Sequence, residues 1–171
     1  MFLALDVHYR NDTAHAAGVA FARIDDVQPQ EIYTAELTGI ADYQPGAFWR
    51  RELPPILHLL RSRQLQPDSL IIDGHVYLDG HTRPGLGARL YQALDARIPV
   101  IGVAKQAFHG MDPACALYRG QSRRPLYVTA AGLPGSEAQA LIASMAGEGR
   151  IPTLLRLVDR ISRAPVLPAA A

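Results

Sequence analysis

Two acidic residues stand out because each lies at the end of an apolar run. Asp6 belongs to the apolar stretch that begins the chain, and Asp73 closes the run Leu70-Ile71-Ile72 and is followed by Gly74. An ionised carboxylate beside a buried strand is costly unless it is paired or bound to a metal. Asp6 alone could equally be an acid that caps a turn. Two such acids at strand ends favour a shared site.

Carboxylates that meet at one point suit a hard divalent cation such as Mg²⁺, which prefers oxygen ligands. A cation held in this way keeps coordination positions open for a phosphate oxygen and an attacking water, and it neutralises charge that develops during phosphodiester hydrolysis. Glu52, at the start of a predicted helix, would be a third ligand. Taken by itself, Glu52 is better interpreted as a solvated helix acid beside Arg50 and Arg51.

The elements that must position these residues can be read from hydrophobic patterning. Apolar runs predict strands over residues 2–7, 14–22, 31–38, 69–74, 99–103 and 126–129. The turn at Asn11-Asp12 and the polar segment 25–30 predict that the first three form an antiparallel meander. Helices are expected over residues 47–63, 85–94, about 136–145 and about 153–163, with Pro54-Pro55 breaking or kinking the first. The strand–helix–strand order of residues 69–103 favours a parallel centre to the sheet.

Composition narrows the class of protein. With 171 residues, of which 49% are hydrophobic, the chain suits one domain, expected over residues 1–164, with a flexible tail at 165–171. The net charge of +1 excludes a global basic field, so a polyanion would have to bind a local patch. Arg119, Arg123 and Arg124 could supply local phosphate contacts or form a solvated turn.

Cysteine usage and hydropathy bear on location. The single cysteine, Cys115, has no partner for an intramolecular disulfide and no metal-binding spacing, which favours a reducing compartment. No signal-peptide pattern is present, and no apolar run reaches the ~18 to 20 residues of a membrane span. We therefore expect a cytoplasmic protein without a membrane partner. The modest size and balanced charge of the chain favour a monomer.

The motifs, taken in chain order, resemble the endonuclease V family. They read Leu5-Asp6-Val7, Tyr43-Gln44-Pro45-Gly46, Arg51-Glu52, Asp73-Gly74-His75, Ile101-Gly102-Val103-Ala104-Lys105 and Arg150-Ile151-Pro152-Thr153 with Arg156 and Asp159. The resemblance extends from Leu3 to about Arg163. It implies a single RNase H-like α/β domain that has a mixed sheet, an antiparallel N-terminal meander, a parallel centre and helices on both faces. In such a sheet the first and fourth strands are neighbours, so acids on them can share a cation.

The resemblance also implies an activity. The family is a group of nucleic-acid repair endonucleases that use Mg²⁺, with Mn²⁺ as an alternative. They cleave DNA or RNA one nucleotide beyond a deaminated purine, above all hypoxanthine, the base of inosine.

Particular residues take on roles through the same resemblance. Asp6, Glu52 and Asp73 match the metal-binding acids, and Lys105 matches a lysine beside the phosphate, where a snorkelling surface lysine is the alternative. Tyr43, Pro45 and Gly46 match a wedge loop that separates strands and stacks on bases. The loop after Asp73 supplies the other expected nucleic-acid contacts, Gly74, His75, His81 and Arg83, although the histidines could simply be exposed loop residues.

Three departures from the family pattern leave other functions open. The chain begins at its first strand without the family's helical extension. The segment between Lys105 and Leu126 is short, while residues 76–81 look like an insertion. Finally, Gly132 stands where a site histidine is expected, so a ligand would be missing, with Glu137 as a candidate substitute. The alternatives are therefore a nucleic-acid-binding protein that cuts poorly or not at all, or a nuclease for another damaged or branched structure.

Overall fold

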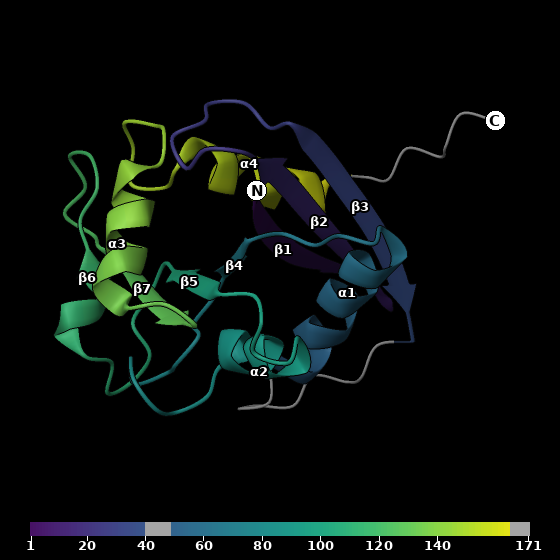
Figure 1. The fold of residues 1–171 in the computed structure, drawn as a ribbon, viewed down its shortest axis with the longest axis horizontal. Coiled ribbons are helices and arrows are strands. Elements are labelled where there is room, and N and C mark those ends of the chain that lie inside the picture. Colours follow the sequence, from purple (N-terminus) through teal and green to yellow (C-terminus); the bar gives the residue numbers. More distant parts are fainter. Residues whose placement is uncertain (40–48, 165–171) are drawn as a thin grey trace.

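Within residues 1–39 and 49–164, which are the residues described by this computed structural model, seven strands form one mixed sheet in the order β3-β2-β1-β4-β5-β7-β6 (Figure 1). The strands are β1 (Phe2–Arg10), β2 (Thr13–Phe21), β3 (Glu31–Thr38), β4 (Ser69–Asp73), β5 (Val100–Ala104), β6 (Ala116–Leu117) and β7 (Leu126–Ala131). The predictions for Tyr43, Pro45, Gly46 and the tail 165–171 lie outside the described residues.

The sheet has the predicted topology. β1 and β2 pair antiparallel from Phe2 opposite Phe21 to Arg10 opposite Thr13, and β3 continues the meander. β1, β4 and β5 run parallel, so the expected parallel centre and the pairing of the first strand with the fourth are both confirmed. β7 is antiparallel to β5. The carboxyl end of β7 therefore lies beside the amino end of β5, away from the carboxyl ends of β1, β4 and β5.

Helices cover both faces of the sheet (Figure 1). On one face, α1 (Trp49–Ser62) and α2 (Leu86–Ala93) bury Ile56, Leu59 and Leu90 against alternate strand residues such as Leu3. On the other face, α3 (Gly135–Ser144) and α4 (Thr153–Arg163) pack against the strand residues Ala4, Ile71 and Val103. These contacts form a second hydrophobic core. A short 3-10 turn, η1 (Pro113–Cys115), precedes β6. None of the helices in these described ranges is long and apolar enough to cross a membrane.

The break expected at Pro54 and Pro55 is absent, because α1 continues through both prolines as a single helix, while the kink stays a prediction. The two prolines stand early in the helix, so the hydrogen bonds that they cannot make are those to the carbonyl groups of Arg50 and Arg51. The buried stripe of Ile56, Leu59 and Leu60 comes after them. Packing of that stripe on the sheet outweighs the loss of two hydrogen bonds.

Candidate metal centre

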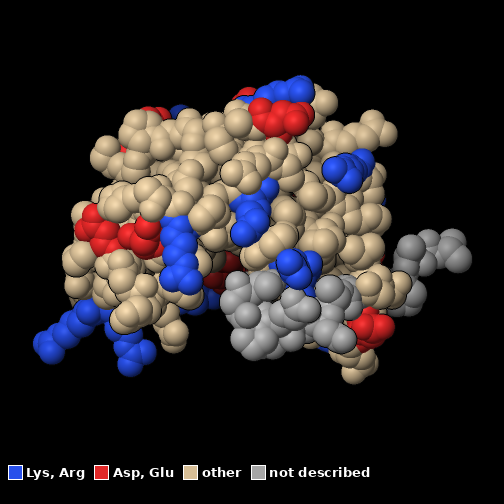
Figure 2. All heavy atoms as spheres, turned by 90° about the horizontal axis from the view of Figure 1, so that it is seen from below, with Lys and Arg blue, Asp and Glu red and all other residues tan. Residues whose placement is uncertain are grey.

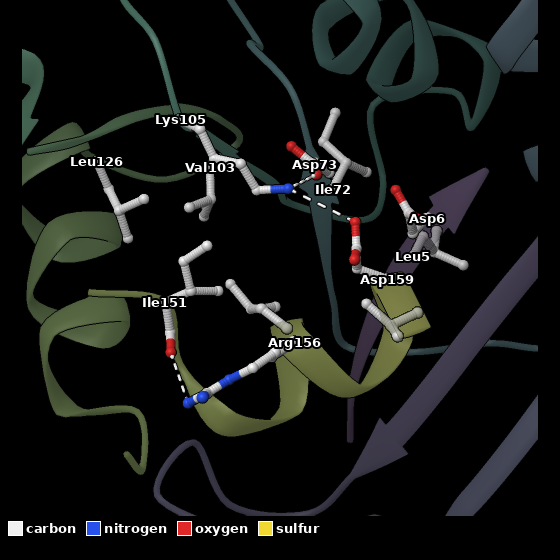
Figure 3. Close-up of a pocket in the computed structure, with 12 residues that line it drawn as sticks. Leu5, Asp6, Ile72, Asp73, Val103, Lys105, Leu126, Ile151, Arg156 and Asp159 are labelled. Atoms are coloured by element: carbon white, nitrogen blue, oxygen red, sulfur yellow. Dashed lines mark hydrogen bonds and ion pairs between the residues drawn. The ribbon is translucent and has the colours of Figure 1, made fainter. Parts of the chain in front are cut away.

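Three carboxylates converge at the carboxyl ends of the parallel strands. Asp6, Asp73 and Asp159 each bring one oxygen within 4.8 Å of the others. Leu5 pairs with Ile72, so the register places Asp6 on β1 beside Asp73 on β4. Both side chains point to the face covered by α4, because strand side chains alternate and Ala4 and Ile71 belong to the core on that side. Asp159 reaches the same point from α4 (Figure 3).

Asp6 is the acid most affected by its surroundings. Burial raises its pKa, and the negative charges of Asp73 and Asp159 add to the rise. The hydroxyl of Ser162 donates a hydrogen bond to Asp6 Oδ2 and, together with the charge of Lys105, acts in the opposite direction. The net shift is upward, as expected for a partly buried acid among other acids.

Lys105 supplies the cationic group at this cluster. Its ammonium nitrogen lies 2.7 Å from Asp73 Oδ2 and 3.6 Å from Asp159 Oδ1 (Figure 3). Burial lowers the pKa of Lys105, but the hydrogen bond to Asp73 and the charges of Asp73 and Asp159 outweigh that effect, so the pKa is raised overall. Lys105 is also the only lysine in the sequence. A side-chain cation thus already contacts two of the acids.

Glu52 approaches from α1, on the other side of the sheet. Its side chain is buried, at 8% exposure. Burial, followed by the negative charges of Asp6 and Asp73, raises the pKa of Glu52 well above its usual value. Glu52 is not one of the three acids whose oxygens lie within 4.8 Å. The alternative of a solvated helix acid is wrong, whereas its role as a metal ligand stays a prediction.

The first turn of α1 is held against β1 by a cation–π contact. The guanidinium of Arg51 lies 4.4 Å from the centre of the Tyr9 ring, three residues beyond Asp6 on the same strand. Arg51 also lowers the pKa of neighbouring Glu52, against the larger upward effect of burial. This contact fixes the helix turn that carries Glu52 next to the strand that carries Asp6.

The loop after β4 contains the other predicted contacts. His75 is half-buried, and burial lowers its pKa, which favours a neutral ring. His81 and Arg83 are exposed. Asp79 accepts hydrogen bonds from three backbone N–H groups and one hydroxyl of residues 81–83, which makes this turn rigid. The loop therefore holds residues 79–83 in one defined turn.

Stacking and pairing fix the tip of the loop. The Arg83 guanidinium lies 5.1 Å from the centre of the Phe108 ring, and His81 Nε2 lies 2.5 Å from Asp112 Oδ2. Gly74, directly after Asp73, has a φ of +141°, a conformation that favours glycine. Gly74 and His75 therefore lie directly after Asp73, whereas His81 lines a separate hollow with Cys115 and Gln139. Contact of these four loop residues with nucleic acid stays a prediction.

The expectation that Gly132 leaves the site incomplete is wrong. Gly132 follows the carboxyl end of β7, where Ala131 pairs with Val100, the first residue of β5. A Cβ atom at position 132 would meet Tyr91 and Pro99, at the end of the sheet opposite to Lys105. Glu137 lies exposed in the first turn of α3 and is not among the three clustered acids.

Asp159 and Ser162 are the candidate site residues that the sequence reasoning did not indicate. Asp159 was noticed as part of a motif but was given no role in the site. Both residues lie on the stripe of α4 that also contains Leu155 and Val158, and Ser162 is buried. Asp159 and Ser162 are polar, yet helical spacing places them on the apolar face of the helix. That mismatch is the sequence signal that could have indicated them.

Two arginines in the described part of the chain have structural roles. Arg119, for which phosphate contact or a solvated turn was expected, is 7% exposed and donates to the backbone carbonyls of Met145, Gly147, Gly149 and Arg150. Both expectations for Arg119 are therefore wrong. Arg150 in turn donates to the carbonyls of Lys105 and Pro125. Together they connect the segment before α4 to the end of β5, which fixes how Asp159 meets Lys105. Arg123 and Arg124 are exposed.

The residues present fit a divalent cation. Carboxylate oxygens from three elements are the donor set that Mg²⁺ and Mn²⁺ prefer, and an ammonium group already stands between two of them. The pocket beside the acids is otherwise lined mainly by apolar side chains, among them Val103, Leu126 and Val158 (Figure 3). An apolar surrounding strengthens electrostatic interactions at the acids.

Fold and acid cluster together define an RNase H-like α/β domain with a carboxylate site at the ends of its central strands. The sequence profile of the endonuclease V family matches residues 1–132, and the chain belongs to that family. It is 28% identical to endonuclease V of Alkalilimnicola ehrlichii over 90% of this chain and 75% of that protein. It is 30% identical to endonuclease V of Nostoc punctiforme over 72% of this chain, a match that spans only 55% of the relative.

Solved structures show the same fold. The catalytic domain of human endonuclease V superimposes with a TM-score of 0.76 at 23% identity, covering 95% of this chain and 80% of that one. Endonuclease V of Ciona intestinalis, in complex with a 24mer DNA that contains an inosine followed by a ribo-adenosine, gives a TM-score of 0.77 at 18% identity. That alignment covers 95% of this chain and 84% of that one.

Proposed function

We propose that this chain is a divalent-cation-dependent endonuclease that hydrolyses a phosphodiester near a deaminated base, such as hypoxanthine, in DNA or RNA. The observation that carries the proposal is the convergence of Asp6, Asp73 and Asp159 within 4.8 Å, with Lys105 in contact with two of them. Three carboxylates repel one another, and the single ammonium group of Lys105 neutralises them only in part, which supports a cation-binding site.

In this proposal Asp6, Asp73 and Asp159 hold Mg²⁺ or Mn²⁺, with Glu52 as a further acid from the α1 side. When bound, the cation supplies an activated water and a positive charge for the scissile phosphate. Glu52 and Asp6, whose pKa values are raised, must lose their protons for the site to bind it well. Ser162 and Lys105 favour that ionised state of Asp6.

Lys105 is the proposed phosphate-binding residue. Its ammonium group can exchange Asp73 for a non-bridging phosphate oxygen, because both are anionic oxygen acceptors. Lys and Arg side chains stand around a hollow in which acidic atoms are recessed, on the face seen from below in Figure 2. This arrangement supplies local positive charge for a polyanion on a chain whose net charge is only +1.

Base recognition is assigned to the residues that the family resemblance indicates. Gly74, His75, His81 and Arg83 are the proposed contacts within the described residues. Tyr43, Pro45 and Gly46, outside them, keep the wedge role that the family resemblance implies. The inosine-containing DNA in the Ciona complex supports hypoxanthine as the base. A cytoplasmic location and a monomeric state stay predictions from the sequence.

A cleavage assay tests the proposal. A single-stranded DNA and its RNA counterpart, each with one inosine, are incubated with the protein and Mg²⁺, alongside the variant Asp73→Ala. The control is Asp95→Ala, which removes an exposed acid paired with Arg97. We expect one product near inosine from the wild type and from Asp95→Ala, and none from Asp73→Ala or in EDTA.

Other results would select the alternatives. Binding of the inosine strand without a metal-dependent product would favour the nucleic-acid-binding protein. Cleavage of a flap, mismatch or uracil substrate in preference to inosine would favour a nuclease for another structure.

A further inference from the structure

We propose that Ser162 is a positioning residue for the cation site, whose hydroxyl holds Asp6 so that the other carboxylate oxygen of Asp6 faces the cation. The proposal rests on the function proposed above, because it concerns the same acids. It adds a residue that is neither an acid nor a phosphate ligand.

The geometry around Ser162 is specific. Its side chain is 2% exposed, and its hydroxyl donates to Asp6 Oδ2 while Oγ also lies 2.9 Å from the backbone carbonyl of Asp159. A serine hydroxyl has one proton, so it can donate fully to only one of these acceptors. An ionised carboxylate is the stronger acceptor, because charge-assisted hydrogen bonds exceed those to neutral carbonyls. The Asp159 carbonyl is the acceptor to which the hydroxyl returns when Asp6 is removed.

The spacing of Ser162 links two acids to one helix. Ser162 follows Asp159 by three residues, so both lie on the same face of α4. That helix therefore delivers one acid to the cluster directly and controls a second acid, Asp6, through a hydroxyl. Since Asp6 comes from β1, the hydrogen bond also fixes the position of the end of α4 relative to the strand.

The consequence for the site follows from charge repulsion. The negative charges of Asp73 and Asp159 repel the carboxylate of Asp6. Without a hydrogen bond to hold it, the Asp6 side chain would rotate away from them. With Oδ2 engaged by Ser162, the torsion angles of Asp6 are set and Oδ1 is left for the cation. Partners that orient a metal ligand in this way typically contribute 10- to 100-fold in metal affinity. We expect a loss of this size without the hydroxyl.

A merely structural role is the competing explanation. Serine side chains often donate to a carbonyl three residues earlier in a helix, as Ser144 does to Leu141 in α3. Ser144 makes that same local bond and no contact with an acid in the interactions described for it. Ser144 is exposed, so it is a control for the local helix hydrogen bond alone, and the burial of Ser162 needs variants at position 162 itself.

The test measures cation binding directly, by electron paramagnetic resonance of free Mn²⁺ during titration of the whole chain. The variants are Ser162→Ala, Ser162→Cys, Ser162→Thr and Ser144→Ala, with thermal unfolding in EDTA as the check on folding. Cysteine keeps nearly the volume of serine but is a weak donor, whereas threonine keeps the hydroxyl. We expect Ala and Cys at position 162 to raise the dissociation constant 10- to 100-fold, and Thr and the Ser144 variant to stay within about threefold of the wild type.

The outcomes separate this proposal from the function on which it rests. If the wild type binds Mn²⁺ and Ser162→Cys binds it equally well, the positioning role is rejected while the nuclease proposal stands. If the wild type and all variants fail to bind Mn²⁺, both are rejected. Should Ser162→Ala not fold, the Cys and Thr variants decide between a lost donor and a lost packing contact.

Discussion

The ammonium group of Lys105 lies 2.7 Å from Asp73 Oδ2, so a basic side chain is directly paired with a proposed cation ligand. The pair is partly exposed, with about two fifths of each side chain accessible, and water screens it. A divalent cation that takes Asp73 as a ligand must therefore compete with Lys105. The same competition would free the ammonium group for a phosphate.

This relationship predicts opposite effects of Lys105→Met on binding and on cleavage. Without the ammonium group, Asp73 and Asp159 are more available, so the Mn²⁺ dissociation constant is expected to fall a few-fold. Cleavage is expected to fall about 100-fold, because a preorganised positive charge beside the phosphate is lost. Mn²⁺ titration and single-turnover cleavage at saturating Mg²⁺ measure the two effects. Parallel losses in both would show that Lys105 acts on the cation and not on the phosphate.

The exchange of partners by Lys105 can also be observed spectroscopically. Because Lys105 is the only lysine, reductive ¹³C-methylation labels a single side chain besides the chain's amino terminus. The charges of Asp73 and Asp159 keep the pKa of Lys105 raised despite burial, so neutralisation of those acids by Mg²⁺ should lower it. We expect the pH titration of the ¹³C signal to move to lower pH on addition of Mg²⁺. In the variant Asp73→Asn, the Lys105 signal should titrate at lower pH even without Mg²⁺. Addition of Mg²⁺ should then move this titration little further.

Most of the sheet could be predicted from sequence, because the strands are apolar runs separated by turn residues. Asp6 and Asp73 were identifiable since an acid that ends such a run is conspicuous. Gly132 was matched to a site histidine through the family resemblance, and such a local match does not reveal strand direction. In a parallel β7 its carboxyl end would reach the site, whereas the antiparallel pairing of β7 with β5 puts it at the opposite edge. The sequence did not indicate Asp159 as a candidate ligand, because a helix acid among arginines resembles a surface residue until the packing of α4 is known.

Asp159→Asn is expected to weaken the site as strongly as a change in a strand acid. The amide keeps the size of the side chain but removes one of the three charges that attract the cation. A loss of about 100-fold or more in cleavage at limiting Mg²⁺ is expected, by analogy with the loss of other groups that stabilise charge. The control is Asp95→Asn, at an exposed acid paired with Arg97. Equal activity of the two variants would remove Asp159 from the site.

The raised pKa of Glu52 predicts an unusual dependence of stability on pH in EDTA. Burial and the charges of Asp6 and Asp73 raise this pKa in the folded state above its unfolded value. The folded protein therefore binds the proton more tightly, and this contribution to stability, complete below the unfolded pKa, is lost as pH rises through the folded pKa. Glu52→Gln has no charge to bury, so its melting temperature should exceed that of the wild type at pH 8 by a few degrees.

That difference should shrink towards pH 4, where Glu52 is protonated in the wild type. The exposed Glu148 provides the control, since Glu148→Gln should show no such trend. Saturating Mn²⁺ should reverse the order at pH 8, because a ligand that binds only the folded state stabilises it and the wild type binds more tightly. A Glu52→Gln variant that is less stable than the wild type in EDTA at pH 8 would contradict a destabilising burial of the Glu52 charge.

Gly102 shows how a residue without a side chain supports the acid at the neighbouring strand end. A Cβ atom at this position of β5 would lie 2.5 Å from the carbonyl oxygen of Gly74 and 2.7 Å from the backbone nitrogen of Val76. That nitrogen donates to the buried Thr129 hydroxyl at 2.8 Å, so the segment cannot move away freely. Gly102→Ala must displace the chain directly after Asp73, at a cost of about 1 to 3 kcal/mol, typical of an overpacked core.

We expect Gly102→Ala to lower the melting temperature by roughly 2 to 12 °C. It should also lower cleavage well below the melting temperature, because the shift begins one residue after Asp73. Gly135→Ala is the control, since a Cβ there meets nothing within 4 Å and alanine favours the helix that starts at this residue. Gly102→Ala could melt at a lower temperature and still cleave at the wild-type rate when fully folded. That result would show that the backbone of residues 74–76 stabilises the fold but does not position Asp73.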